Sequence, residues 1–202
     1  MDPGAETARG GRKPVEIHAA PLGRLFAFLV DALLLTGVVF AFSMALDATV
    51  GPAVSFRAEE GGAGNGFMIH RDRVMLAWIL NVALGAGYFI GSWARRSGRD
   101  LPSTPGQRLL RIAVGRTGGS RPITLAQATA RWLLLMGPVS LCALLGIVAP
   151  ASRAPVALAS LAWYLILLVT TLRSPAGRGL HDRFSGSIVT VRARRAGPGS
   201  SP

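Results

Sequence analysis

Four long stretches of apolar residues alternate with polar segments along the chain. They cover about residues 25–46, 74–94, 132–149 and 154–172. A helix needs about 20 consecutive apolar residues to cross the hydrocarbon core of a bilayer, and its backbone polar groups must be satisfied internally there. The pattern therefore predicts an all-α integral membrane protein with four transmembrane helices. Only four residues separate the last two stretches, so these two helices are expected to cross in opposite directions.

The positive charges concentrate on one side of the predicted spans. The 202 residues include 22 Lys and Arg against 10 Asp and Glu, which gives a net charge of +12. Eighteen of the 22 lie before the first span, between the second and third, or after the fourth; four lie in the other two loops. This asymmetry predicts that both termini and the middle loop are cytoplasmic. We expect these arginines to contact anionic lipids and not nucleic acid, because they flank membrane ends without an aromatic recognition motif.

The inventory of reactive side chains is sparse. Cys142 is the only cysteine and there are three histidines, so neither a disulfide nor a zinc-binding spacing is available. The chain also lacks a nucleophile elbow, a histidine cluster within the spans and paired acids on one predicted face. We therefore expect no metal site, no cofactor and no enzymatic activity.

The segments outside the spans differ in composition. Residues 1–20 and 193–202 are predicted to be disordered cytoplasmic tails, because they are rich in Gly, Pro, Ser, Ala and Arg. They flank a transmembrane domain over residues 21–192. The loop over residues 47–73 is glycine-rich and predicts no core of its own, and we assign it no function.

The loop between the second and third spans contains helix and strand signals. Thr104 followed by Pro105 is typical of a helix start and predicts a short interfacial helix, and Thr124 is expected to cap the helix of the third span. Residues 113–116, a Gly118-Gly119 turn and residues 122–123 suggest a short β-hairpin, to which residues 188–191 could add a strand.

Asp31 is the main candidate for a functional residue. It lies six residues into the first span counted from Leu25, roughly 9 Å along a helix. A carboxylate within a bilayer costs about 2.5 to 3.5 kcal/mol and normally faces the bundle interior, takes up a proton or pairs with a cation. Arg24 is the nearest arginine on the same helix face, although a second arginine could pair better. Asp31 is interpreted either as a cation or proton site or as an ion pair that fixes helix packing.

Other residues are secondary candidates. Asn81 could coordinate a cation or form an interhelical hydrogen bond, and His181 could transfer protons or stabilise its turn. Ala83, Gly87 and Gly91 form a stripe of small residues that permits close packing of helices.

Several motifs together resemble the RDD family. They are Arg24 and Asp31 at the first span, residues 104–110 (TPGQRLL) with the following Ile-Ala-Val, and His181-Asp182 before residues 188–189. The resemblance covers about residues 21–191, and the arginine and two aspartates of the family name correspond to Arg24, Asp31 and Asp182. It implies a multi-pass protein of the bacterial inner (plasma) membrane. Gln107 stands where family members often have lysine, and Ser187 where they often have threonine.

The resemblance also implies a function in outline. Family members are suspected of transporting a small ligand, and sodium/proton exchange is proposed for some. We therefore expect a buried cluster of Arg24, Asp31 and Asp182 that binds a small ligand, a cation or a proton. With only four spans, transport would require a homo-oligomer. The alternative is a non-transporting accessory or assembly module in which the charge cluster is structural.

Overall fold

The computed structural model describes residues 18–58, 65–95, 101–117 and 121–191. Its elements in chain order are α1 (Pro21–Val50), β1 (Val54–Ala58), β2 (Asn65–Ile69), α2 (Arg71–Ala94), α3 (Pro105–Leu109), β3 (Ile112–Arg116), α4 (Leu125–Val148), η1 (Pro150–Ser152), α5 (Arg153–Arg173), α6 (Leu180–Phe184) and β4 (Ser187–Val191).

The four long helices confirm the four predicted apolar spans. Each of α1, α2, α4 and the η1–α5 segment is long and apolar enough to cross a membrane. α1 and α5 extend beyond the predicted apolar stretches at both ends, whereas α2 and α4 do so only at their starts. α1 has 30 residues, about 45 Å at 1.5 Å per residue. Many large apolar side chains on these helices are exposed at the bundle surface, as is expected where lipid surrounds a protein.

The helices are arranged around α4. This helix packs against α2 on one side and α5 on the other, whereas α1 packs against α2 and the short helix α3. Pro138 lies inside α4 and has no N–H for the carbonyl of Leu134. The indole of Trp163 on α5 donates to that carbonyl at 2.8 Å, and Tyr164 donates to the neighbouring Leu135 carbonyl at 2.6 Å. The proline thus leaves the Leu134 carbonyl as an acceptor that attaches α5 to α4.

Both predicted helix caps are confirmed. The side chain of Thr104 caps α3 and that of Thr124 caps α4. In each case the third helical residue is a glutamine, Gln107 or Gln127, whose side chain accepts from the capping residue's N–H. These reciprocal bonds form two capping boxes.

The hairpin predicted between the second and third spans is wrong in its pairing. β3 pairs antiparallel with β4, with Val114 opposite Val189, whereas residues 122–123 belong to no strand. Pro122 lacks the N–H that a ladder requires, and β4 offers five residues in register. The strand suggested near residues 188–191 is confirmed, and it ties the end of the chain to the α2–α4 connection.

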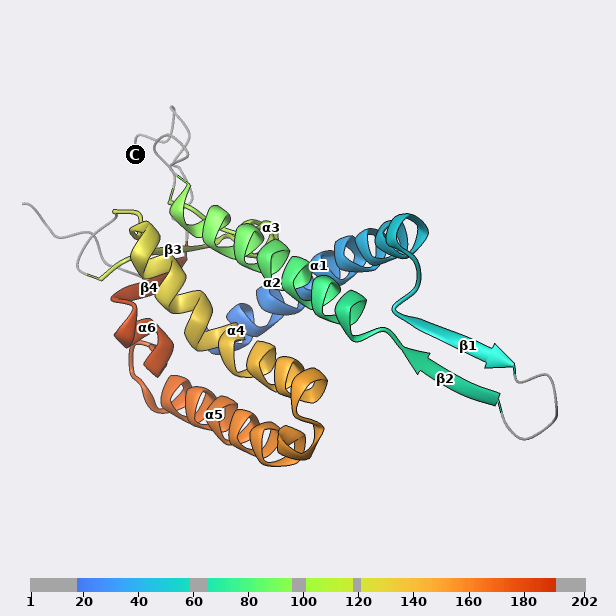
Figure 1. The fold of residues 1–202 in the computed structure, drawn as a ribbon. Coiled ribbons are helices and arrows are strands. Elements are labelled where there is room, and N and C mark those ends of the chain that lie inside the picture. The colour runs from blue at the N-terminus through green and yellow to red at the C-terminus, as the bar shows by residue number, and fades with distance from the viewer. Residues whose placement is uncertain (1–17, 59–64, 96–100, 118–120, 192–202) are drawn as a thin grey trace, which may run out of the picture.

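The loop over residues 47–73 contains a second sheet that the sequence analysis missed. β1 and β2 form an antiparallel hairpin in which Phe56 lies opposite Phe67, with ring centroids 4.7 Å apart. The alternation of apolar Val54, Phe56 and Ala58 with polar residues in β1 was the available signal. The hairpin projects from the end of the bundle opposite to α6, β3 and β4 (Figure 1). We call the end with α3, α6, β3 and β4 the arginine-rich end.

The predicted N-terminal tail is too long by three residues. His18 forms a β-bridge with Thr190, and the N–H of buried Ala19 donates to the carbonyl of Val189 at 3.2 Å. Residues 18–20 therefore belong to the folded part. The rest of that tail, and the predicted tail over residues 193–202, lie outside the described residues.

Candidate functional site

Asp182 is the centre of a buried charge cluster at the arginine-rich end. Its side chain is fully buried, and its two carboxylate oxygens bind guanidinium groups from two different helices. Arg24 of α1 donates to Oδ2 at 3.1 Å, and Arg131 of α4 donates to Oδ1. Because Asp182 itself belongs to α6, one carboxylate joins three elements that are far apart in the sequence.

Arg24 also connects the start of α1 to backbone on both sides of α6. Its guanidinium donates to the carbonyls of Ala19 at 3.1 Å, Gly177 at 2.5 Å and Val189 at 3.2 Å. Gly177 has a φ of +59°, a conformation that favours glycine and that orients this carbonyl. The predicted site residues Arg24 and Asp182 are thus brought together.

Arg131 is a site residue that the sequence analysis missed. It donates to the hydroxyl of Ser187 at 2.5 Å as well as to Asp182, and its guanidinium carbon lies 5.1 Å from the ring centroid of Trp93. Arg131 is only 5% exposed. The sequence offered one signal, because Arg131 follows the Thr124 cap by two helical turns and precedes the apolar stretch of the third span directly.

Asp31 is separate from this cluster, so the expected pairing with Arg24 is not found. It is 2% exposed, and its oxygens accept from the Thr104 hydroxyl at 2.5 Å, the Gly106 N–H at 2.8 Å and the Tyr88 hydroxyl at 2.7 Å. Among the described residues no ion pair includes Asp31. The side chain of Asp31 therefore joins α3 and α2 to α1 through uncharged donors, which satisfy its buried oxygens.

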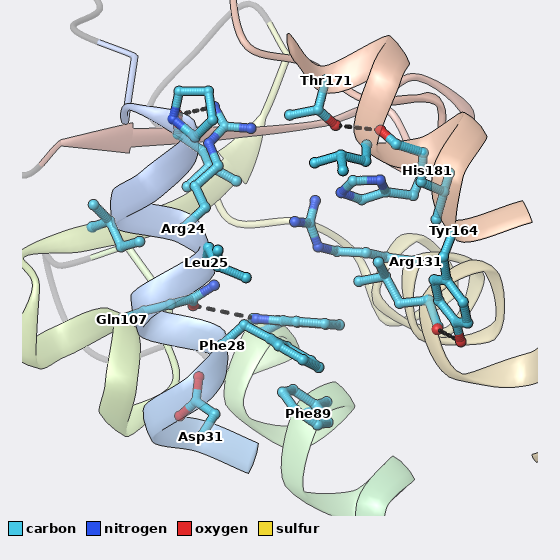
Figure 2. A pocket seen from close by; sticks show the side chains of 17 residues that line it. Arg24, Leu25, Phe28, Asp31, Phe89, Gln107, Arg131, Tyr164, Thr171 and His181 are labelled. Carbon is cyan, nitrogen blue, oxygen red and sulfur yellow. Dashed lines mark hydrogen bonds between the residues drawn. The ribbon is translucent and has the colours of Figure 1, made fainter. Parts of the chain in front are cut away.

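A cavity of about 290 Å³ lies between the two sets of contacts. One wall is α1, with Arg24, Leu25, Phe28 and Asp31; the opposite wall includes Tyr164 and Thr171 of α5 with His181 of α6 (Figure 2). Arg131 and the aromatic residues Phe89 and Trp93 complete the lining. Three predicted site residues, Arg24, Asp31 and His181, therefore line one cavity, while Asp182 lies behind its polar end.

Comparison with protein families finds one match over this region. The model of the RDD family matches residues 18–186. This range includes all four long helices and the residues Arg24, Asp31 and Asp182. The chain belongs to the RDD family. No curated protein and no solved structure matches the chain.

The RDD residues of this chain fall into two units. Arg24 and Asp182 belong to the Arg24–Asp182–Arg131 cluster, whereas Asp31 belongs to the junction between α1 and α3. Ser187, at the position where family members often have threonine, supplies a hydroxyl that binds Arg131 and donates to Asp182 at 3.3 Å. The hydroxyl therefore stabilises the charge cluster in this chain.

Gln107 has a structural task in this RDD protein that lysine could not perform. Its side-chain oxygen accepts from the Thr104 N–H at 3.0 Å and from the Trp93 indole at 3.3 Å, and the residue is 8% exposed. A lysine ammonium has donors only and cannot accept either bond. The departure from lysine therefore gives α3 a capping box and a direct bond to α2.

His181 borders Asp182 and is held neutral. Its Nε2 lies 3.5 Å from Asp182 Oδ1. Burial lowers the pKa of His181 to about 4, and the charge of Arg131 lowers it further than Asp182 raises it. Burial alone would raise the pKa of Asp182, but the charge of Arg131, with smaller contributions from Arg24 and from His181 in its protonated form, outweighs burial, so this pKa lies below its ordinary value of 3.8. At neutral pH the cluster thus holds two guanidinium groups, one carboxylate and a neutral imidazole.

Acidification from pH 7 to pH 5 is expected to lower the stability of the protein by about 2 kcal/mol through His181. Between pH 6.5, the ordinary pKa of histidine, and about pH 4, its pKa in the folded protein, the unfolded state binds one more proton. Thermal unfolding in detergent at both pH values measures the loss. His181→Gln should remove most of this pH dependence, and His70→Gln, at the opposite end of the bundle, should keep it. Equal pH dependence in wild type and His181→Gln would contradict the prediction.

Apart from His181, the secondary candidates lie away from this cavity. Asn81 lines a different cavity, of about 320 Å³ between α2 and α4, where its side-chain oxygen is buried without a hydrogen-bond partner among the described residues. Ala83, Gly87 and Gly91 are exposed, and no atom of the described chain lies within 4 Å of a Cβ built on either glycine. Within this chain, the predicted small-residue stripe is therefore not a helix-packing face.

Proposed function

We propose that this RDD family protein binds a small ligand inside the membrane, in the cavity between α1 and α5, and carries it through the bilayer. The observation that supports this function is that Arg24, Arg131 and His181 reach one end of a cavity whose other walls are largely apolar. Such a combination of apolar walls and a few convergent polar groups is typical of small-molecule sites. Both carboxylates are engaged by other elements, so they maintain the shape of this cavity.

We place the arginine-rich end in the cytoplasm and the protein in the bacterial inner membrane. The support is the distribution of basic residues, of which eighteen of 22 lie before the first predicted span, between the second and third, or after the fourth. Exposed arginines at this end, such as Arg108 and Arg183, are positioned to contact anionic lipid headgroups. A homo-oligomer would supply the additional spans that a carrier with four helices needs.

The binding step is tested by native mass spectrometry of the purified protein, which detects any co-purified small molecule as added mass. Wild type is expected to carry a bound molecule. Leu168→Phe, at a half-exposed position of the lining, should reduce its occupancy several-fold, and Leu165→Phe, one helical turn earlier and outside the lining, should not. An absence of added mass, or equal occupancy in the two variants, would overturn the proposal.

Cation exchange for protons is a second candidate function, favoured by the position of Asp31 in the wall of the same cavity. Its test is flux in liposomes with a trapped pH dye under sodium, potassium or proton gradients. Loss of cation-driven proton movement in Asp31→Asn, with retention in Tyr88→Phe, would support exchange, because the second variant keeps the carboxylate and removes only one donor. No flux from folded wild type would overturn it.

A non-transporting assembly module is the alternative, and different observations favour it. Asp31 and Asp182 each join elements that are distant in the sequence, as structural residues do. The exposed stripe of Ala83, Gly87 and Gly91 would admit a closely packed helix of another subunit. Absence of both a bound small molecule and ion flux, together with a stable complex between subunits, would favour this module over the carrier.

A further inference from the structure

The cavity between α1 and α5 opens toward lipid. Three of its lining side chains are exposed at the bundle surface: Leu25 at 51%, Phe28 at 41% and Leu168 at 53%. Leu25 and Phe28 lie on one turn of α1, and Leu168 lies on α5, so they border the same opening from both sides. Because these helices are the spans that the bilayer surrounds, an occupant enters through the hydrocarbon region and must itself be apolar over much of its length.

The inner end of the cavity is polar and positively charged. Arg131 lines it, is 5% exposed, and has its Nε atom buried without a hydrogen-bond partner in the described part of the chain. The Nδ1 atom of His181, another lining residue, is also buried without a hydrogen-bond partner among the described residues. Such buried unsatisfied polar atoms are rare in native proteins, and Arg131 Nε, which is a donor, calls for an acceptor as its partner.

The charges at this end favour an anion as that partner. Arg24 and Arg131 together carry two positive charges, and Asp182, which pairs with both, carries one negative charge. The three groups therefore have a net positive charge. Asp31 lies farther along α1, and its oxygens are directed to Thr104, Gly106 and Tyr88. An anionic oxygen near Arg131 Nε would therefore complete the hydrogen bonds of the guanidinium and neutralise the remaining charge.

We propose that the cavity binds a single-chain anionic amphiphile, whose carboxylate or phosphate lies at Arg131 and Arg24 and whose acyl chain leaves between α1 and α5. This inference rests on the proposed binding function and names its ligand class. A volume of about 290 Å³ is just below the usual range for ligand sites, about 300 to 1,000 Å³, and therefore fits one chain better than a two-chain phospholipid.

The test uses the fluorescence of Trp93, a residue of the cavity lining, in phosphatidylcholine nanodiscs. Dibromostearate quenches tryptophan on contact, and the expected result is a saturable component that unbrominated stearate displaces. Trp93→Phe should lose this component, because Trp78, Trp132 and Trp163 do not line the cavity. Leu168→Phe should weaken binding several-fold and Leu165→Phe should leave it unchanged.

The headgroup is tested without changing the charge cluster, because an arginine variant could fail to fold. The methyl ester of dibromostearate has the same chain and no charge, and should bind at least tenfold more weakly. Equal binding of acid and ester would overturn the anionic specificity while the proposed binding function stands. Displacement of the quencher by inorganic phosphate alone would overturn the requirement for a chain. No saturable quenching by any probe would overturn the inference, while added mass in native spectra would still support binding of another ligand.

Discussion

Asp182→Asn is expected to destabilise the protein by about 3 to 5 kcal/mol, the range found when one partner of a buried ion pair is removed. The variant leaves the buried Arg131 and the partly buried Arg24 with only a neutral amide between them. The amide NH₂ of asparagine is also a hydrogen-bond donor. It cannot bind a guanidinium group, because a guanidinium group has donors only. We expect α6 to detach from α1 and α4, with a lower unfolding temperature and less monodisperse protein.

Thermal unfolding in detergent, followed by tryptophan fluorescence, measures this effect. Asp47→Asn is the matched control, because Asp47 is exposed near the other end of α1. Ser187→Ala gives a graded comparison: it removes a hydroxyl from the same cluster and should cost about 1 to 3 kcal/mol, so it reports on the cluster even if Asp182→Asn does not fold. Equal unfolding temperatures for wild type and Asp182→Asn would show that the ion pairs contribute little.

Gly106→Ala should separate α3 from α1 and have the second-largest effect. A Cβ at this position would lie 2.2 Å from the carbonyl oxygen of Ala27 and 2.9 Å from the carboxylate carbon of Asp31. The first obstacle is helix backbone, so it cannot move aside as a flexible side chain would. Forced overpacking costs about 1 to 3 kcal/mol, and Asp31 would in addition lose the N–H of Gly106 and the hydroxyl of Thr104.

The control for Gly106→Ala is Gly87→Ala on α2, where the added Cβ meets no atom of the described residues within 4 Å outside its own stretch of helix. That variant is expected to keep or slightly raise the unfolding temperature, since alanine is the better helix former by about 0.5 to 1 kcal/mol. An unchanged unfolding temperature in Gly106→Ala would mean that the close contact between α3 and α1 is not required for folding.

The sequence could predict most of the local structure. The four spans follow from the length of their apolar stretches, and the starts of α3 and α4 follow from Thr104 and Thr124 with a glutamine three residues later. These features depend on residues close together in the chain. The predicted pairing of residues 113–116 with 122–123 was wrong, because nearness in sequence favoured a local hairpin. The true partner, β4, lies more than 70 residues away.

The site was predictable only in part. Arg24, Asp31 and Asp182 were identified through the family resemblance, yet nothing in their spacing shows that the structure divides them between two units. Arg131 was counted among the loop arginines, although it is a buried partner of Asp182. Tyr88 was not distinguished from the other apolar and aromatic residues of its span, although its hydroxyl binds Asp31.

By itself, then, the sequence determined that this chain is a four-span membrane protein of the RDD family and where α3 and α4 begin. A bilayer imposes length and apolarity on each span separately, and a cap acts within one helical turn, so one-dimensional patterns carry this information. Only the tertiary structure decided which donors each buried carboxylate receives and that a cavity with two arginines lies between α1 and α5. Those outcomes depend on how helices far apart in the chain rotate and pack, because the partners of a buried charge are fixed by geometry and not by their distance along the sequence.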